Sequence, residues 1–522
     1  MASATPSLPA TGIKLTYDTL LHVISVSFDA REAVKLMATC RLLYHEGAKI
    51  ALKKAVVIRN TKQLASFLKF LRAEELSRCR HLRQLELWAY HRPYTEPDLA
   101  QELVQTIPLL INIEYLRLYH VEELLEPYPA LSLALAALTS LRHIEFDGAG
   151  GVTCELLSLL QSPLISASIN FLGDSDERIW DHLDFDEWPK YHPTTLLSNF
   201  APTLEELQCT AWYTTSDTVI SDKVYPNMRK LSIELHEFPL RMDPFIRAFP
   251  NLTDLRVHTE YHGGGVGTFD LENMQTSREI NVTAQEFSGT WPHLEHFSGC
   301  LVDLYAIGLA CHIRRVTIVD NLDDGPRTDM LATVLRSARP LDLKLEGITG
   351  SMLGDSDRGL ISMLRDESAS RLLNFAVCIY FGEDDREKDL GVVINDLVSA
   401  LVHLPLKSLE MRFDTQMLDP TPKPDFVEVM TRRHRGLPEP PVPTPAPLTP
   451  AELSLRALGM NIDALVARLE SVPSLEAARV VLPTSRNGGD DYTRTITKGT
   501  ARLLGDEQWE DWLPGKNELG WP

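Results

Sequence analysis

The sequence predicts an α/β fold in which a short strand and a helix alternate many times, preceded by a small all-helical segment. An apolar residue is repeatedly followed by others three and five positions later, and the copies from Leu85 to Leu255 lie 23 to 40 residues apart. Stretches with helical periodicity separate the copies. The net charge of the chain is −21, of which the first sixty residues contribute +4 and the remaining residues −25. The N-terminal segment therefore differs in charge from the rest of the chain.

The composition sets the class of protein. With 522 residues, 44% apolar and 24% charged, the chain can bury a large core, which excludes disorder throughout. Its longest strongly apolar stretch, Ala130 to Leu138, is far shorter than the roughly 18 residues that cross a bilayer. We therefore expect a soluble protein with no membrane partner. The acidic balance also argues against nucleic acid, because phosphate binding needs clustered basic side chains.

The N-terminal region shows no basic leader followed by an apolar segment, so we expect a cytoplasmic or nuclear protein. Residues 1–13 are expected to be disordered. The seven cysteines are scattered without a C-x-x-C pair, and we interpret them as thiols in a reducing compartment. Asn251 and Asn281 begin sequences that match the glycosylation pattern, which we attribute to chance.

The repeated pattern indicates a strand because side chains three and five positions on share one face of an extended chain. The first apolar residue turns inward from the preceding loop, often after a proline that fixes φ. Weaker copies lie near Ala167, Leu343 and Phe375. The second apolar positions of the clearer copies are Leu85, Leu116, Ile144, Leu207, Leu231, Leu255, Phe297, Val316, Leu409 and Ala478.

This spacing resembles the leucine-rich repeat, L-x-x-L-x-L-x-x-N/C, with insertions. Only Asn321 supplies an asparagine at the usual ladder position, where Val121, Trp212 and Val302 stand in other copies. We therefore expect an irregular solenoid over residues 59–485. A purely helical repeat is the alternative, although this spacing makes a poor helix face. Apolar stripes predict helices at 99–107, 330–335, 360–364, 390–401 and 453–469.

Residues 14–58 resemble an F-box. The matching segments are LTYDTLLHVI at 15–24 and AVKLMATCRLLY at 33–44, against a pattern of roughly L-P-x-E-x-L-x-x-I and a helix that ends V-C-R-x-L/W. Thr16, Asp18 and Thr39 differ from the usual proline, glutamate and valine. A strand at 53–58 would join this segment directly to the solenoid, as in F-box proteins with leucine-rich repeats.

The resemblance implies that the chain is the substrate-recognition subunit of an SCF (cullin–RING) ubiquitin ligase. The F-box would bind the Skp-type adaptor, and the repeats would hold a protein to be degraded. The positions that match the adaptor face, or the small core behind it, are Leu15, Leu20, Val23, Ile24, Val34, Leu36, Met37 and Cys40. The alternative is a leucine-rich-repeat scaffold without a ligase role, whose N-terminal helices only cap the first repeat.

In a strand-lined solenoid, the residues that alternate with the buried positions face outward on the concave side. Their mixed charge favours a folded protein or a peptide as the partner. The residues expected to bind the target are Tyr115, Arg117, His143, Lys230, Arg256, His296, Arg315 and Lys344.

We find no catalytic constellation and expect a protein that is not an enzyme and uses no cofactor or metal. The glycine-rich run at His262–Gly267 resembles an esterase oxyanion loop, but the chain has no G-x-S-x-G nucleophile motif. The imidazoles of His293 and His296 would point to opposite sides of a strand. A hydrolase remains a distant third hypothesis, and the acidic run Asp174 to Glu187 is interpreted as a solvated insertion.

Two late segments interrupt or follow the repeats. Residues 417–450 contain ten prolines, which favour an extended loop or spacer, with a docking motif for a proline-recognition domain as the alternative. Residues 486–522 form an acidic tail with three tryptophans, which we expect to cap the end of the solenoid or to fold back onto its face.

Overall fold

The computed structural model places the elements of the chain in two compact units. Among the described residues, the first comprises those up to Tyr191 and Thr195–Glu206, and the second comprises His192–Thr194 and those from Leu207 onward. Each unit is described by itself. The structure describes residues 16–26, 30–88, 97–172, 188–212, 214, 223–234, 240–258, 271–322, 326–353, 359–415, 417–421, 426–435, 437, 446–482, 492–498 and 503.

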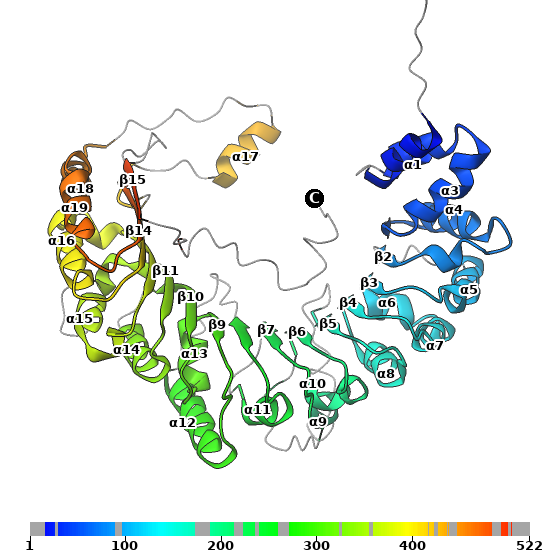
Figure 1. The fold of residues 1–522 in the computed structure, drawn as a ribbon, viewed down its shortest axis with the longest axis horizontal. Coiled ribbons are helices and arrows are strands. Elements are labelled where there is room, and N and C mark those ends of the chain that lie inside the picture. Colours follow the sequence, from blue (N-terminus) through cyan, green and yellow to red (C-terminus); the bar gives the residue numbers. More distant parts are fainter. Residues whose placement is uncertain are drawn as a thin grey trace, which may run out of the picture. The chain divides into compact units, whose positions relative to one another are not determined.

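The first unit begins with three helices and continues as alternating strands and helices (Figure 1). The three helices, here called the head, are α1 (Tyr17–Val26), α2 (Ala30–Met37) and α3 (Arg41–Ala51). They are followed by β1 (Ala55–Ile58), α4 (Thr61–Arg72), β2 (Gln84–Trp88), α5 (Pro97–Thr106), β3 (Tyr115–Tyr119), α6 (Val121–Leu125), α7 (Pro129–Ala136), β4 (His143–Asp147), α8 (Gly151–Leu159), β5 (Ser166–Asn170) and α9 (Trp188–Tyr191). Helix α10 (Pro193–Leu196) and strand β6 (Glu206–Thr210) lie at the border of the two units.

Strands β1 to β5 are parallel, and each pairs with the next in chain order. Leu85 pairs with Leu116, Leu116 with Ile144, and Ile144 with Ala167. These are the second apolar positions of successive copies of the motif, so the predicted repeat and its weak copy at Ala167 are confirmed. Helices α4, α5, α7 and α8 lie on one side of these strands (Figure 1).

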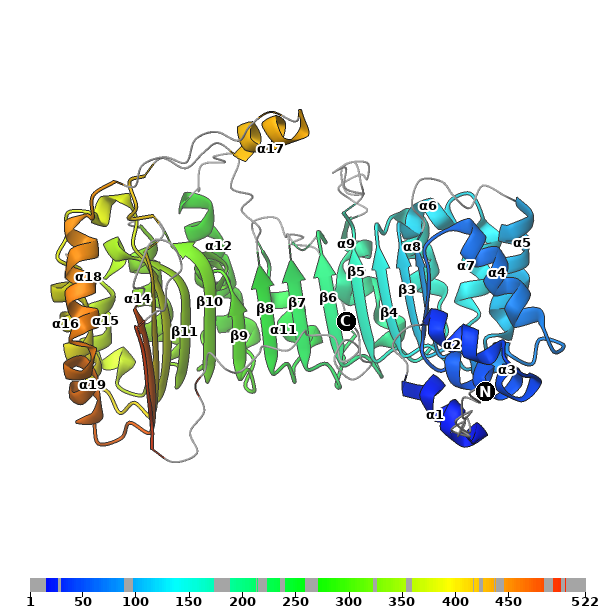
Figure 2. The ribbon, with the colours of Figure 1, turned by 90° about the horizontal axis from the view of Figure 1, so that it is seen from above.

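The second unit continues the same alternation, and its strands are seen side by side in Figure 2. Its elements are β7 (Lys230–Glu234), α11 (Asp243–Ala248), β8 (Asp254–His258), α12 (Leu271–Ser288), β9 (His296–Gly299), α13 (Leu301–Ile307), β10 (Arg315–Leu322), α14 (Pro326–Ala338), β11 (Asp342–Thr349), α15 (Leu360–Arg365), β12 (Asn374–Tyr380), α16 (Leu390–Leu401), β13 (Ser408–Asp414), α17 (Phe426–His434), α18 (Pro450–Met460), α19 (Ile462–Glu470), β14 (Ala477–Leu482) and β15 (Tyr492–Thr497).

Strands β7 to β14 are parallel and paired in chain order, and β15 pairs antiparallel with β14. The second apolar positions align again: Leu231, Leu255, Phe297, Val316, Leu343, Phe375, Leu409 and Ala478 occupy one continuous register. An antiparallel partner can follow a short connection, whereas a parallel one needs a crossover of a dozen or more residues, and only nine residues separate β14 from β15.

The turns before the strands explain the first position of the motif. Leu82, Ile113 and Leu141 are buried as expected. Each is followed by a residue whose N–H donates to the carbonyl of the matching turn in the preceding repeat, as Glu114 donates to Arg83 at 2.8 Å. Stacked turns thus extend the strand pairing toward the N-terminal side and satisfy backbone groups that would otherwise be buried without partners.

Several elements differ from what the sequence pattern predicts. Val121, Trp212 and Val302 are buried, so at these ladder positions apolar packing replaces the asparagine ladder. Helix α17 lies inside the proline-rich segment that was expected to be an extended spacer, and strand β15 lies within residues 486–522, which were expected to form only a tail. The tail's tryptophans, the acidic run 174–187 and the glycine-rich run at 262–267 lie outside the described residues.

Candidate protein-binding surfaces

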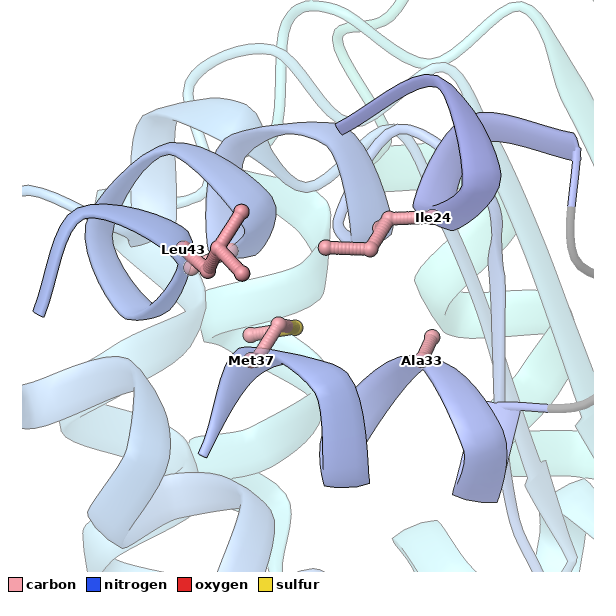
Figure 3. Close-up of a cluster of buried hydrophobic side chains, with 5 residues drawn as sticks. Ile24, Ala33, Met37 and Leu43 are labelled. Atoms are coloured by element: carbon pink, nitrogen blue, oxygen red, sulfur yellow. The ribbon is translucent and has the colours of Figure 1, made fainter. Parts of the chain in front are cut away.

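The three head helices enclose a small apolar core of their own (Figure 3). Leu20, Leu36 and Cys40 pack against it with partly buried side chains. Gly47 of α3 allows the close approach of the helices, because a Cβ there would lie 2.8 Å from Cγ of Met37 and 2.9 Å from Cδ1 of Ile24. The core consists of Ile24, Ala33, Met37, Leu43 and Ala48.

The structure therefore separates the predicted F-box residues into two groups. Ile24 and Met37 belong to the core, whereas Val23 and Val34 are exposed at 44% and 59% of their surface. Leu15 lies outside the described residues. Exposed apolar side chains that the motif comparison did not single out accompany them on the same three helices: Tyr17, Val26, Leu42 and Tyr44.

A buried arginine attaches the head to the first repeat. The guanidinium of Arg78 lies between the rings of Tyr44, on α3, and Phe70, on α4, at 4.4 and 4.3 Å from their centroids. One of its nitrogens donates to Oε1 of Glu74 at 2.6 Å, and that oxygen also contacts Nδ1 of His45 at 2.6 Å. We call Arg78, Tyr44, Phe70 and Glu74 the Arg78 cluster. Its hydrogen bonds hold the pKa of Glu74 below the usual range.

The predicted target-binding residues of the first unit lie on the neighbouring strands β3 and β4, and Arg117 already forms a cross-strand ion pair. Tyr115 is buried and pairs in register with His143, whose pKa is lowered by burial. Arg117 contacts Glu145 at 3.1 Å across β3 and β4. On the other side of Arg117 stands Glu86, which is buried; burial raises its pKa to about 7, although Arg117 opposes the shift.

A stacked aromatic pair lies at the C-terminal ends of β2 and β3. The rings of Trp88 and Tyr119 stack with centroids 3.8 Å apart on β2 and β3. Arg59 lies 5.4 Å from the Trp88 ring, and Arg117 lies 4.5 Å from the Tyr119 ring. Cross-strand aromatic and charged pairs of this kind stabilise a sheet by a few tenths to about 1 kcal/mol each. They are therefore first of all parts of the sheet.

The strand side chains of the second unit form similar pairs. His296 contacts Asp254 at 2.6 Å, and Arg315 contacts Asp342 at 3.5 Å. Lys344 contacts Glu346, two residues along the same strand, at 2.7 Å. Arg256 lies 4.0 Å from Glu234, and the charge of Lys230, the register partner of Asp254, helps to lower the pKa of that carboxyl. Most of the predicted residues thus serve cross-strand ladders, which the sequence pattern alone did not reveal.

One position interrupts these ladders. In the register of the second unit, Lys344 of β11, Ala376 of β12, Glu410 of β13 and Arg479 of β14 are successive neighbours. The small side chain of Ala376 between longer ones leaves a hollow of about 260 Å³ on the strands. Its lining also includes Glu346, Cys378, Tyr380 and Arg412. Lys344 was predicted from the sequence as a target-binding residue. That Ala376 lies between longer side chains is seen only from the strand register.

Other kinds of site receive no support from the described residues. Within the ranges given above, no three His, Cys, Asp or Glu side chains are grouped so that they could hold a metal ion. None of the described helices is long and apolar enough to cross a membrane. None of the seven cysteines forms a disulfide bond: Cys79, Cys154, Cys209 and Cys300 are buried, and the other three are partly buried.

Comparison with known proteins adds a structural likeness. No family model matches the chain, and no curated protein sequence matches it. Among solved structures, it is similar to the leucine-rich repeat-containing protein LegL7 from Legionella pneumophila, with 12% sequence identity and a TM-score of 0.29. The match covers 65% of this chain and 96% of that one. The strand register and the strand–helix alternation themselves resemble those of a leucine-rich-repeat solenoid.

Proposed function

We propose that the chain is the substrate-recognition subunit of a cullin–RING ubiquitin ligase. On this proposal the head binds a Skp-type adaptor, and the strands of the repeats bind the protein to be ubiquitinated. The chain itself performs no chemistry, because ubiquitin transfer belongs to the partner subunits.

The observation that carries the proposal is the exposed apolar surface of the head. The core of the three helices is already filled, yet Val23, Val26 and Val34 remain exposed on α1 and α2. Apolar surface left in water costs about 25 cal/mol per Å², and a concentration of it on a small helical unit is typical of a surface that a partner covers. The resemblance of residues 15–24 and 33–44 to the F-box pattern supports a Skp-type adaptor as that partner.

Co-purification with a Skp-type adaptor tests the proposal. Val23→Asp combined with Val34→Asp should abolish binding, because two charges would be buried against an apolar partner surface. Both side chains are exposed in the free protein, so the fold should persist. Ile24→Asp is a poor test, because Ile24 lies in the core. Lys62→Asp, on an exposed position of α4, adds the same charge outside the head and should leave binding unchanged.

A leucine-rich scaffold without a ligase role is the second candidate. It is favoured by the contact of Phe70, on the first repeat's helix, with the head core and by the Arg78 cluster, because both let the head cover the end of the first repeat. This candidate predicts that the unaltered chain retains no Skp-type adaptor and that removal of residues 1–52 lowers the melting temperature of the repeats. Adaptor retention that is lost in the Val23 and Val34 variant would reject it.

A further inference from the structure

The hollow at Ala376 contains a buried acceptor without a partner. Glu410 is 5% exposed and lines the hollow. Its Oε2 atom is buried and has no hydrogen-bond partner in the described part of the chain. Leaving such an acceptor unpaired is costly, since a buried polar group normally finds a donor. The geometry is therefore incomplete without a donor supplied from elsewhere.

The arginines near Glu410 do not supply that donor. Arg479 and Arg412 approach Oε1 of Glu410 at 3.5 and 3.7 Å, which is long for a charge-assisted hydrogen bond. The side chain of Arg412 is 59% exposed, so it can move aside at little cost in packing. Lys344, on the opposite side of Ala376, forms an ion pair with Glu346 at 2.7 Å.

The negative charge of the chain favours a cationic group as the ligand of the hollow. Residues 61–522 carry −25, so a basic partner is attracted over a long range and accelerated in its approach. A planar guanidinium can donate two parallel hydrogen bonds to one carboxylate, which Arg412 and Arg479 do not achieve here. The alkyl part of an arginine would lie against the Ala376 methyl group and the ring of Tyr380, which line the hollow.

We propose that the hollow between β11 and β13 binds an arginine side chain of the protein partner, with Glu410 as its carboxylate ligand. The incoming guanidinium takes the place of Arg412 and pairs with both carboxylate oxygens. The proposal deepens the assignment of the strands as the target-binding surface, and it is independent of whether the head binds a ligase adaptor.

Methyl NMR on the full chain, labelled at alanine methyl groups, tests the proposal with N-acetyl-arginine amide as the probe. The Ala376 resonance, assigned by its loss in Ala376→Gly, should shift saturably as the probe is added. N-acetyl-citrulline amide has nearly the same shape but no charge, and it should bind about tenfold more weakly, because a charge-assisted hydrogen bond is lost. The shift caused by the arginine probe should also weaken as salt is raised.

Glu410→Gln keeps the size of the side chain and should reduce binding of the arginine probe by about tenfold, with the alanine spectrum otherwise preserved. Glu346→Gln is the matched control, because it removes a carboxylate from the same hollow that already has a partner in Lys344. Equal shifts with the two probes, or undiminished binding to Glu410→Gln, would overturn the proposal. Adaptor co-purification measures the head separately, so either proposal can fail while the other stands.

Discussion

Replacing Arg78 tests whether the head is held to the first repeat by one buried cation. Arg78→Ala removes two cation–π contacts from a side chain that is only 2% exposed, each taken at about 1 kcal/mol because Tyr44 is itself 39% exposed. It also removes the ion pair with Glu74, which is partly exposed and therefore contributes only about 1 kcal/mol. The expected loss is about 3 kcal/mol, which corresponds to a fall of about 6 to 12 °C in the melting temperature of a unit of this size.

Differential scanning fluorimetry measures the loss, and hydrogen exchange locates it. Protection should fall in α1 to α3 and in α4, because the Arg78 cluster joins these elements. Arg78→Met keeps much of the packing without the charge and should lie between the alanine variant and the unaltered chain. Arg80→Ala, at an exposed arginine two residues away, should change stability by less than about 0.5 kcal/mol. If Arg78→Ala were no more harmful than Arg80→Ala, the cluster would not fasten the head.

Three further perturbations probe the sheet and the head core. Burial raises the pKa of Glu86 to about 7 in the folded chain, so the folded state binds more protons than the unfolded state at pH values between its unfolded and folded pKa. The free energy of unfolding should therefore fall as pH rises from about 5 through 7. Glu86→Gln should flatten this pH dependence, as measured by chemical denaturation. Gly299→Ala should destabilise the second unit by about 3 kcal/mol in urea unfolding, since its Cβ would lie 1.7 Å from a carbonyl oxygen of β8, while Gly382→Ala, with open space around it, should be nearly neutral. Ile24→Ala should cost 2 to 5 kcal/mol of local stability of the head by hydrogen exchange, and Val34→Ala less than about 0.5; equal effects would contradict the assignment of core and surface.

The repeated strands and helices were predictable because the residue spacing within each repeat is enough to indicate its strand. Leu85 and Leu116 mark their strands by local spacing alone, and pairing them needs no knowledge of distant residues. Even the weak copies at Leu343 and Phe375 fall into register, because a parallel strand between two others has only one alignment that buries its apolar residues.

Helix α12 shows where local pattern fails. Its buried side chains include Ser277, Asn281 and Gln285, so the helix has no apolar stripe from which the sequence could predict it. Asn281 donates to the carbonyls of Leu240 and Ala306, and its own oxygen accepts from the N–H of Met242. Polar side chains act as core here because they satisfy backbone groups of neighbouring repeats. Burial also removes Asn281 from consideration as a glycosylation site.

The sequence by itself determined the alternation of strand and helix, the helical head and the charge difference between head and body, because these depend on spacing and composition. Only the tertiary structure decided which head residues are core and which are surface, since Val23 and Ile24 are neighbours in the chain but differ in burial. It also decided that most charged strand residues are paired across strands. The hollow at Ala376 depends on which side chains the strand register places beside it, and the sequence of one strand does not show which residues of the next strands it will pair with.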